Sequence, residues 1–251
     1  MTPFVRTWGG GRTLLIHCAL AHSGVLGRIA ERIPGGAIAF DLPGHGQSPP
    51  WDGVGDYHGR CVDWALEALA GRPRPIIGHS LGATVALRLA VHHPDLVTCL
   101  TLIEPVYFAA LRTGDPDAYR AHLAASQPLV AHHEAGDLMA MAEWFTGHWG
   151  GAPFSTLPEK LQKTMAAQMP LIIAQDPGLD GDSGGVFEPG RLEALDCPVT
   201  LIRGSESQPS VAAIHAVILS RLPNAREFIV AGAGHMAPVS HPAEVARLSQ
   251  L

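Results

Sequence analysis

Short apolar runs alternate with longer amphipathic stretches over the first half of the chain. Residues 12–20 (RTLLIHCAL) and 36–48 (GAIAFDLPGHGQS) each hold a strand-like apolar run that ends in a loop. Residues 24–33 between them carry apolar side chains at helical spacing, and residues 56–71 form an amphipathic pattern closed by Gly71. This alternation predicts parallel strands joined by crossover helices.

The alternation stops after residue 105 and returns near residue 191. Residues 106–190 hold helical patterns and a loose stretch rich in Pro, Gly and Asp, without a convincing strand. We therefore expect one α/β domain, made of residues 1–105 and 191–251, with a helical cap of residues 106–190 inserted into it. The chain of 251 residues, 47% of them hydrophobic, is long enough to bury such a core.

A Gly-x-Ser-x-Gly motif lies at the junction of a predicted strand (74–80) and a predicted helix (81–94). In this motif Ser80 would occupy a very tight turn, and glycines at positions 78 and 82 would let strand and helix approach closely. The helix N-terminus would then face a developing oxyanion. A plain Gly/Ser turn in an ordinary crossover is the alternative, but the flanking strand and helix favour a nucleophile elbow.

Several motifs in the same order resemble the α/β-hydrolase superfamily, in the group with a helical cap. The run LLIHCAL lies where that family carries its oxyanion loop, FDLPGHGQS resembles a turn after the next strand, and AGAGHMAPVSHP resembles the segment with the catalytic histidine. The resemblance covers nearly the whole core. It implies an α/β-hydrolase fold, with a mostly parallel central sheet flanked by helices and an inserted helical cap.

The resemblance also implies roles for individual residues. His235 would be the general base, with His241 a weaker candidate because a proline follows it. The backbone amides of Leu81 and Ala19, with Leu20 as an alternative to Ala19, would bind the oxyanion. Cys18 stands where the family has a glycine, either as a small packed residue or as part of the pocket wall, whereas His79 would point away from the pocket and Asp41 would serve a structural turn.

The catalytic acid is missing from its usual place. In the family it follows a late strand three residues after a glycine, and here that position is Ser207, which cannot carry the charge. Glu104 could replace it, because it ends the strand next to the predicted nucleophile strand. Glu206 is the alternative acid, in the right loop but shifted by one residue. The third possibility is that no acid exists.

Composition narrows the possible partners. A net charge of -6 without a block of Lys or Arg argues against a nucleic-acid surface. The start of the chain lacks a signal-peptide pattern, no apolar run is long enough for a membrane span, and the four widely spaced cysteines fit reduced thiols. We expect a cytoplasmic protein that binds a small-molecule substrate and uses no metal and no cofactor. The sequence does not indicate the oligomeric state.

These features predict a serine hydrolase that cleaves a small-molecule ester through an acyl-enzyme. Trp144, Phe145 and Trp149 are candidates for the apolar lining of the substrate pocket, although packing of the cap on the core would use them equally well. Two alternatives stay open. One is a cofactor-free carbon–carbon hydrolase or perhydrolase on the same residues, and the other is a non-catalytic binder of small molecules.

Overall fold

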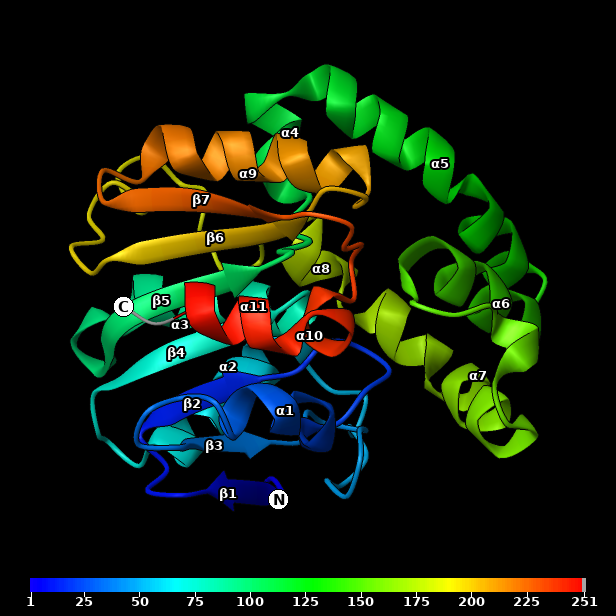
Figure 1. The fold of residues 1–251 in the computed structure, drawn as a ribbon. Helices are drawn as coiled ribbons and strands as arrows, with labels where there is room; N and C mark the ends of the chain where they lie inside the picture. The colour runs from blue at the N-terminus through cyan, green and yellow to red at the C-terminus, as the bar shows by residue number, and fades with distance from the viewer. Residues whose placement is uncertain (250–251) are drawn as a thin grey trace.

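The computed structural model describes residues 1–249, built around a sheet in the strand order β1-β3-β2-β4-β5-β6-β7 (Figure 1). Strand β1 pairs antiparallel with β3, and the other neighbouring pairs are parallel. The strands are β1 Val5–Trp8, β2 Thr13–Ile16, β3 Ala37–Phe40, β4 Arg74–His79, β5 Val97–Ile103, β6 Val199–Gly204 and β7 Ala225–Val230. Within the described residues, the sheet is therefore mostly parallel, as the alternating pattern predicts.

Both faces of the sheet are covered, because successive strand residues point to opposite sides. Leu14 and Ile16 of β2 join the larger core cluster with helices α2, α3 and α9, whereas Leu15 joins a second cluster with α1 and α11. Figure 1 shows α1, α10 and α11 in front of the strands and α2 and α3 behind them. These elements are η1 Ser23–Leu26, α1 Gly27–Ala30, α2 Tyr57–Leu69, α3 Leu81–His92, η2 Pro94–Leu96, α9 Pro209–Arg221, α10 Ala237–Ser240 and α11 Pro242–Leu248.

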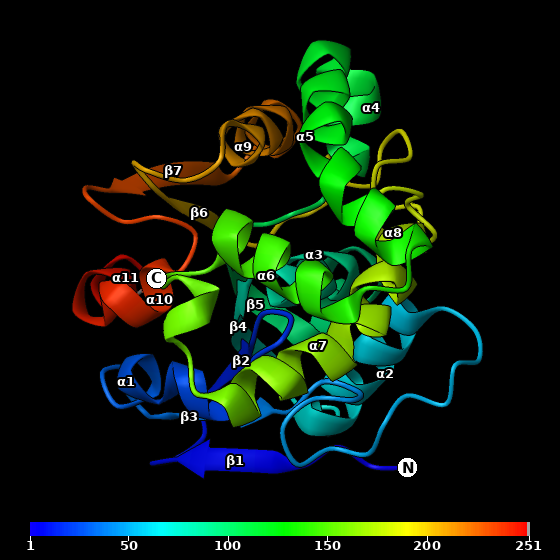
Figure 2. The ribbon, with the colours of Figure 1, turned by 90° about the vertical axis from the view of Figure 1, so that its right-hand side faces the viewer.

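The chain between β5 and β6 is helical, and its middle part lies to one side of the sheet (Figures 1 and 2). Its elements are α4 Ala109–Gly114, α5 Pro116–Glu134, α6 Leu138–Trp149, η3 Phe154–Thr156, α7 Glu159–Ala174 and α8 Asp176–Leu179. Met141 and Met169 belong to a small apolar cluster within the helical segment. Tyr107 and Val186, near the two ends of that segment, are buried in the main core. None of the helices in residues 1–249 is both long and apolar enough to cross a membrane.

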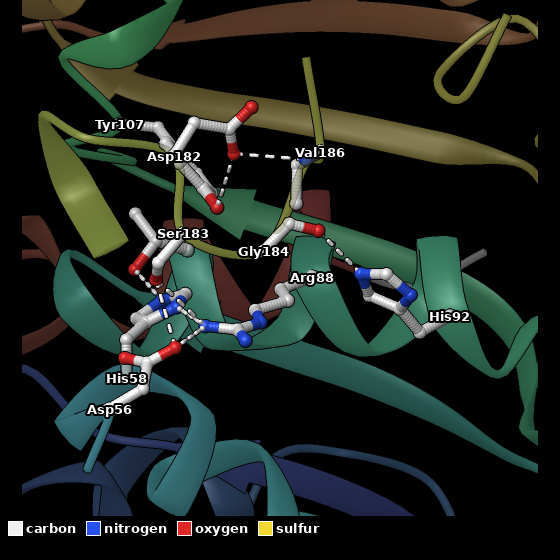
Figure 3. Close-up of polar contacts among 10 residues, drawn as sticks. Asp56, His58, Arg88, His92, Tyr107, Asp182, Ser183, Gly184 and Val186 are labelled. Atoms are coloured by element: carbon white, nitrogen blue, oxygen red, sulfur yellow. Dashed lines mark hydrogen bonds and ion pairs between the residues drawn. The ribbon is translucent and has the colours of Figure 1, made fainter. Parts of the chain in front are cut away.

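A polar network fixes the loop that leads from α8 back to the core (Figure 3). Arg88 of α3 pairs with the carboxylate of Asp56, the residue before α2, at 2.6 Å, and Ser183 donates to the same oxygen at 2.8 Å. The Tyr107 hydroxyl donates to Asp182 at 3.3 Å. Because Ser183 and Asp182 follow α8, these contacts hold the end of the helical segment against α2 and α3.

Candidate active site

Ser80 lies on a strained turn between β4 and α3. Its backbone has φ 54° and ψ -118°, a combination that residues other than glycine rarely adopt. A Cβ at Gly78 would lie 2.2 Å from the Gly82 carbonyl oxygen, and one at Gly82 would lie 2.2 Å from the Ile16 carbonyl oxygen. The two glycines are therefore required by close backbone packing, which holds the serine side chain above the end of the strand.

Three side chains from the ends of three strands form one chain of contacts. His235 Nε2 lies 2.9 Å from Ser80 Oγ, and His235 Nδ1 lies 3.0 Å from Glu104 Oε2. All three residues are buried. A carboxylate at Nδ1 fixes the neutral ring with its proton on that nitrogen, so Nε2 is free to accept the serine proton. The carboxylate that contacts His235 is thus Glu104.

Glu104 is fully buried and is surrounded by donors. Its Oε1 accepts the Gly204 amide at 2.6 Å and the hydroxyl of Ser207. Burial by itself raises the pKa of Glu104, but the hydrogen bond and charge of His235, with the bonds from Ser207 and Gly204, hold the pKa below its usual value. The group is therefore ionised at neutral pH, in the state that stabilises a protonated imidazole.

The loop after β6 holds both the alternative acid, Glu206, and the serine at the family's acid position, Ser207. Glu206, the alternative acid, is exposed, and its backbone amide donates to the Ala233 carbonyl at 2.9 Å. Ser207 occupies the position where an acid is expected from the family pattern, and it donates to Glu104. The sequence gives no signal for this contact, because the two residues are 103 positions apart.

Of the amides expected to bind an oxyanion, two have positions that suit this role. Leu81 is the first residue of α3, where backbone amides have no acceptor within the helix, and Ala19 lies beside Ser80 in the wall of the same cavities. Leu20 does not fit, since its amide donates to His45 Nε2 at 3.0 Å and is not available to a ligand.

Two buried histidines, His17 and His45, fix this loop. His45 donates from Nδ1 to the Pro43 carbonyl at 2.9 Å, which leaves Nε2 as the acceptor for Leu20. Burial lowers the pKa of His45 to about 4, so the ring is neutral at pH 7. His17 contacts the Cys18 carbonyl through Nδ1 at 2.7 Å and accepts the Leu42 amide at Nε2 at 2.9 Å. The Cys18 side chain itself is buried and lines the larger cavity.

His79, next to the serine, contacts the backbone rather than a cavity. Its Nε2 lies 2.9 Å from the carbonyl oxygen of His235. Burial, together with the nearby His235, lowers the pKa of His79 to about 3, so the ring is neutral and donates this bond. The ring thereby fixes the loop that carries His235. His241, the weaker base candidate, has its Nδ1 2.8 Å from the Ser240 hydroxyl instead.

Two cavities meet at Ser80. The larger, about 500 Å³, also reaches His235 and is walled mainly by apolar side chains such as Leu157 and Met236. The smaller, about 180 Å³, lies under the helical segment. Phe145 and Trp149 line both cavities, and Trp144 lines the smaller one. Within residues 1–249, no group of three or more His, Cys, Asp or Glu side chains is arranged to hold a metal ion.

Comparison with known proteins places this geometry in a family. Lipase LipV of Mycobacterium tuberculosis is 28% identical over 254 residues, which cover 95% of this chain and 91% of that protein. A pimeloyl-[acyl-carrier protein] methyl ester esterase of Chromobacterium violaceum is 36% identical over 109 residues, or 41% of each chain.

Solved structures agree in fold. The 2-hydroxy-6-oxo-6-phenylhexa-2,4-dienoate hydrolase of Rhodococcus sp. strain RHA1 superposes with a TM-score of 0.71 over 98% of this chain and 92% of that one, at 18% identity. A family model described as the alpha/beta hydrolase family matches residues 13–248. Because that match spans strands β2 to β7, the helical segment and all three contacting side chains, this protein belongs to the alpha/beta hydrolase family.

Proposed function

We propose that this hydrolase cleaves small-molecule carboxylic esters, with Ser80 as nucleophile, His235 as general base and Glu104 as the acid of a catalytic triad. The observation that carries the proposal is the continuous contact from Ser80 Oγ through His235 to Glu104, at 2.9 Å and 3.0 Å. The esterase and lipase names of the relatives support the ester as the substrate class.

The chemistry proceeds in two halves. Ser80 Oγ attacks the ester carbonyl carbon while His235 Nε2 takes its proton, and the amides of Leu81 and Ala19 stabilise the oxyanion. The tetrahedral intermediate collapses, the protonated imidazole gives its proton to the departing alkoxide, and an acyl-serine remains. Water, deprotonated by His235, then attacks the acyl group, and the same proton returns to Ser80 as the acid leaves.

The helical segment, residues 106–190, would act as a cap over this site. Its helix α6 supplies Phe145 and Trp149 to the walls of both cavities beside Ser80. Apolar walls exclude water and strengthen the electrostatic interactions of the oxyanion. On this division, the core comprises residues 1–105 and 191–251, and the cap determines which esters fit.

A fluorophosphonate probe tests the nucleophile, and a series of p-nitrophenyl esters tests the reaction. We expect the probe to label the wild-type protein at Ser80 and to leave Ser80→Ala unlabelled. We also expect ester hydrolysis to fall by at least about 10³-fold in Ser80→Ala and in His235→Ala. A folded protein that is neither labelled nor active on any ester would contradict the proposal and favour a binding function. Labelling without ester hydrolysis would favour the carbon–carbon hydrolase.

A further inference from the structure

The smaller cavity beside Ser80 combines aromatic and acidic side chains. Phe108, Trp144 and Trp149 line it together with Asp176, the first residue of the short helix α8, and Asp180, the residue after that helix. Trp149 also packs edge-on against the ring of His235, at 4.8 Å between ring centroids, so this cavity borders the reacting atoms directly. The proposed ester chemistry uses neither carboxylate.

No cation of residues 1–249 contacts either carboxylate directly, although the charge of Arg112 partly offsets the effect of burial on the pKa of Asp180. Within residues 1–249 neither forms an ion pair, and the nearby Arg112 donates instead to the backbone carbonyl of Asp180 at 3.0 Å. Asp180 Oδ1 accepts the Tyr119 hydroxyl at 3.2 Å. His122, also in the cavity wall, is neutral at pH 7, because burial and the nearby His148 lower its pKa to about 4. The cavity therefore has a net negative lining.

A third polar group lies in the same wall. Gln175, the residue before Asp176, is only 5% exposed, and its Oε1 has no hydrogen-bond partner among the described residues. A buried amide oxygen without a donor is uncommon, since it loses its hydrogen bond to water on folding. The Gln175 amide oxygen and the two carboxylates are all acceptors, so they are suited to a ligand that supplies positive charge or donors.

We infer that the smaller cavity binds an organic ammonium group carried by the ester substrate. This inference rests on the proposed ester hydrolysis and narrows its substrate class. Aromatic faces attract an alkylammonium ion through their quadrupoles, and carboxylates add direct charge attraction in a site that is partly shielded from water. A volume of about 180 Å³ is suited to a compact head group such as trimethylammonium. The larger, apolar cavity would hold the remaining hydrocarbon part.

The test compares two ligands of equal shape, choline and 3,3-dimethylbutan-1-ol, by titration calorimetry at pH 8. Partial burial and the charge of Asp180 raise the pKa of Asp176 to about 7, so the Asp176 carboxylate is mostly ionised at pH 8. We expect choline to bind wild-type protein at least tenfold more tightly than the neutral alcohol. The double variant D176N/D180N should lose this preference, whereas Glu143→Gln, an exposed carboxylate on α6 outside both cavities, should keep it.

Calorimetry separates this inference from the proposed function, because it does not require turnover. Equal binding of the two ligands, no binding of choline, or a preference that survives in D176N/D180N would each overturn the inference, whether or not p-nitrophenyl esters are cleaved. If esters are cleaved, choline should also inhibit p-nitrophenyl butyrate hydrolysis competitively in the wild type and at least tenfold more weakly in the double variant. Non-competitive inhibition would place the ammonium site elsewhere and would equally overturn the inference.

Discussion

Replacing Glu104 by glutamine should lower kcat by about 10⁴-fold, and the structure indicates why. The two carboxylate oxygens of Glu104 receive three donors, which are His235 Nδ1, the Gly204 amide and the Ser207 hydroxyl. A glutamine has one acceptor oxygen, and the Gly204 amide cannot turn away. The new NH₂ group would therefore face His235 Nδ1, and the ring would have to carry its proton on Nε2.

With its proton on Nε2, His235 cannot accept the proton of Ser80. The corresponding change in a Ser-His-Asp triad lowers kcat by about 10⁴-fold, which is about 5.4 kcal/mol of transition-state stabilisation. Hydrolysis of p-nitrophenyl butyrate measures the loss, and a thermal melt followed by circular dichroism checks that the variant is folded. Glu206→Gln is the matched control and should stay within about twofold of wild type, because its side chain is exposed. Near-normal activity of a folded Glu104→Gln would refute the assignment, as would an equal loss in Glu206→Gln.

A double variant extends the same reasoning. Since Ser207 lies within hydrogen-bonding distance of the Glu104 carboxylate, an aspartate at position 207 can bring its charge to the same place. We expect Glu104→Ala/Ser207→Asp to be at least about tenfold more active than Glu104→Ala alone. No recovery in a folded double variant would mean that the carboxylate has to approach from β5.

Three further predictions concern groups around the site. His45→Phe removes the acceptor of the Leu20 amide, so kcat on p-nitrophenyl esters should fall by about tenfold, and unchanged kcat would contradict a role of His45 in holding the oxyanion loop. Arg88→Met leaves Asp56 without its cation and should lower the free energy of unfolding in urea by about 2 kcal/mol. The kcat of this variant should stay within twofold of wild type. An unchanged midpoint of urea unfolding would argue that the network does not stabilise the fold. The raised pKa of Asp176 means that the folded state binds its proton more tightly than the unfolded chain, so stability falls as pH rises from about 4 to about 7. Asp176→Asn should therefore raise Tm over wild type at pH 8 more than at pH 5, and an equal difference at both values would contradict the shift.

Local patterns were sufficient for most of the fold. The strands and helices near Ser80 could be predicted because the glycines at positions 78 and 82 and the apolar runs around them act within a few residues of one another. Strand β1, Val5–Trp8, escaped prediction, because it is an edge strand of four residues whose burial alternates between exposed and intermediate. Such a short and solvated strand has almost no apolar pattern to detect.

The supporting contacts of the site could not be predicted, because they join distant parts of the chain. The ring of His79 meets the carbonyl of His235 across 156 positions, and the Leu20 amide meets His45 across 25. Neither contact leaves a periodic pattern, since each depends on where a loop ends in space. Contacts of this kind follow from the packed fold and not from any local sequence preference.

The position of Glu104 follows from sheet geometry rather than from a fixed place in the sequence. Strands β5 and β6 are parallel neighbours with Ile103 opposite Ile202, so both chains leave the sheet at the same edge. A carboxylate that follows either strand can therefore reach the same nitrogen of His235, and the extra methylene of glutamate helps it to span the distance from β5. Ser207 then provides a donor that helps to keep the carboxylate ionised. An absent aspartate after β6 is thus a poor sign of lost activity unless the end of β5 lacks a carboxylate as well.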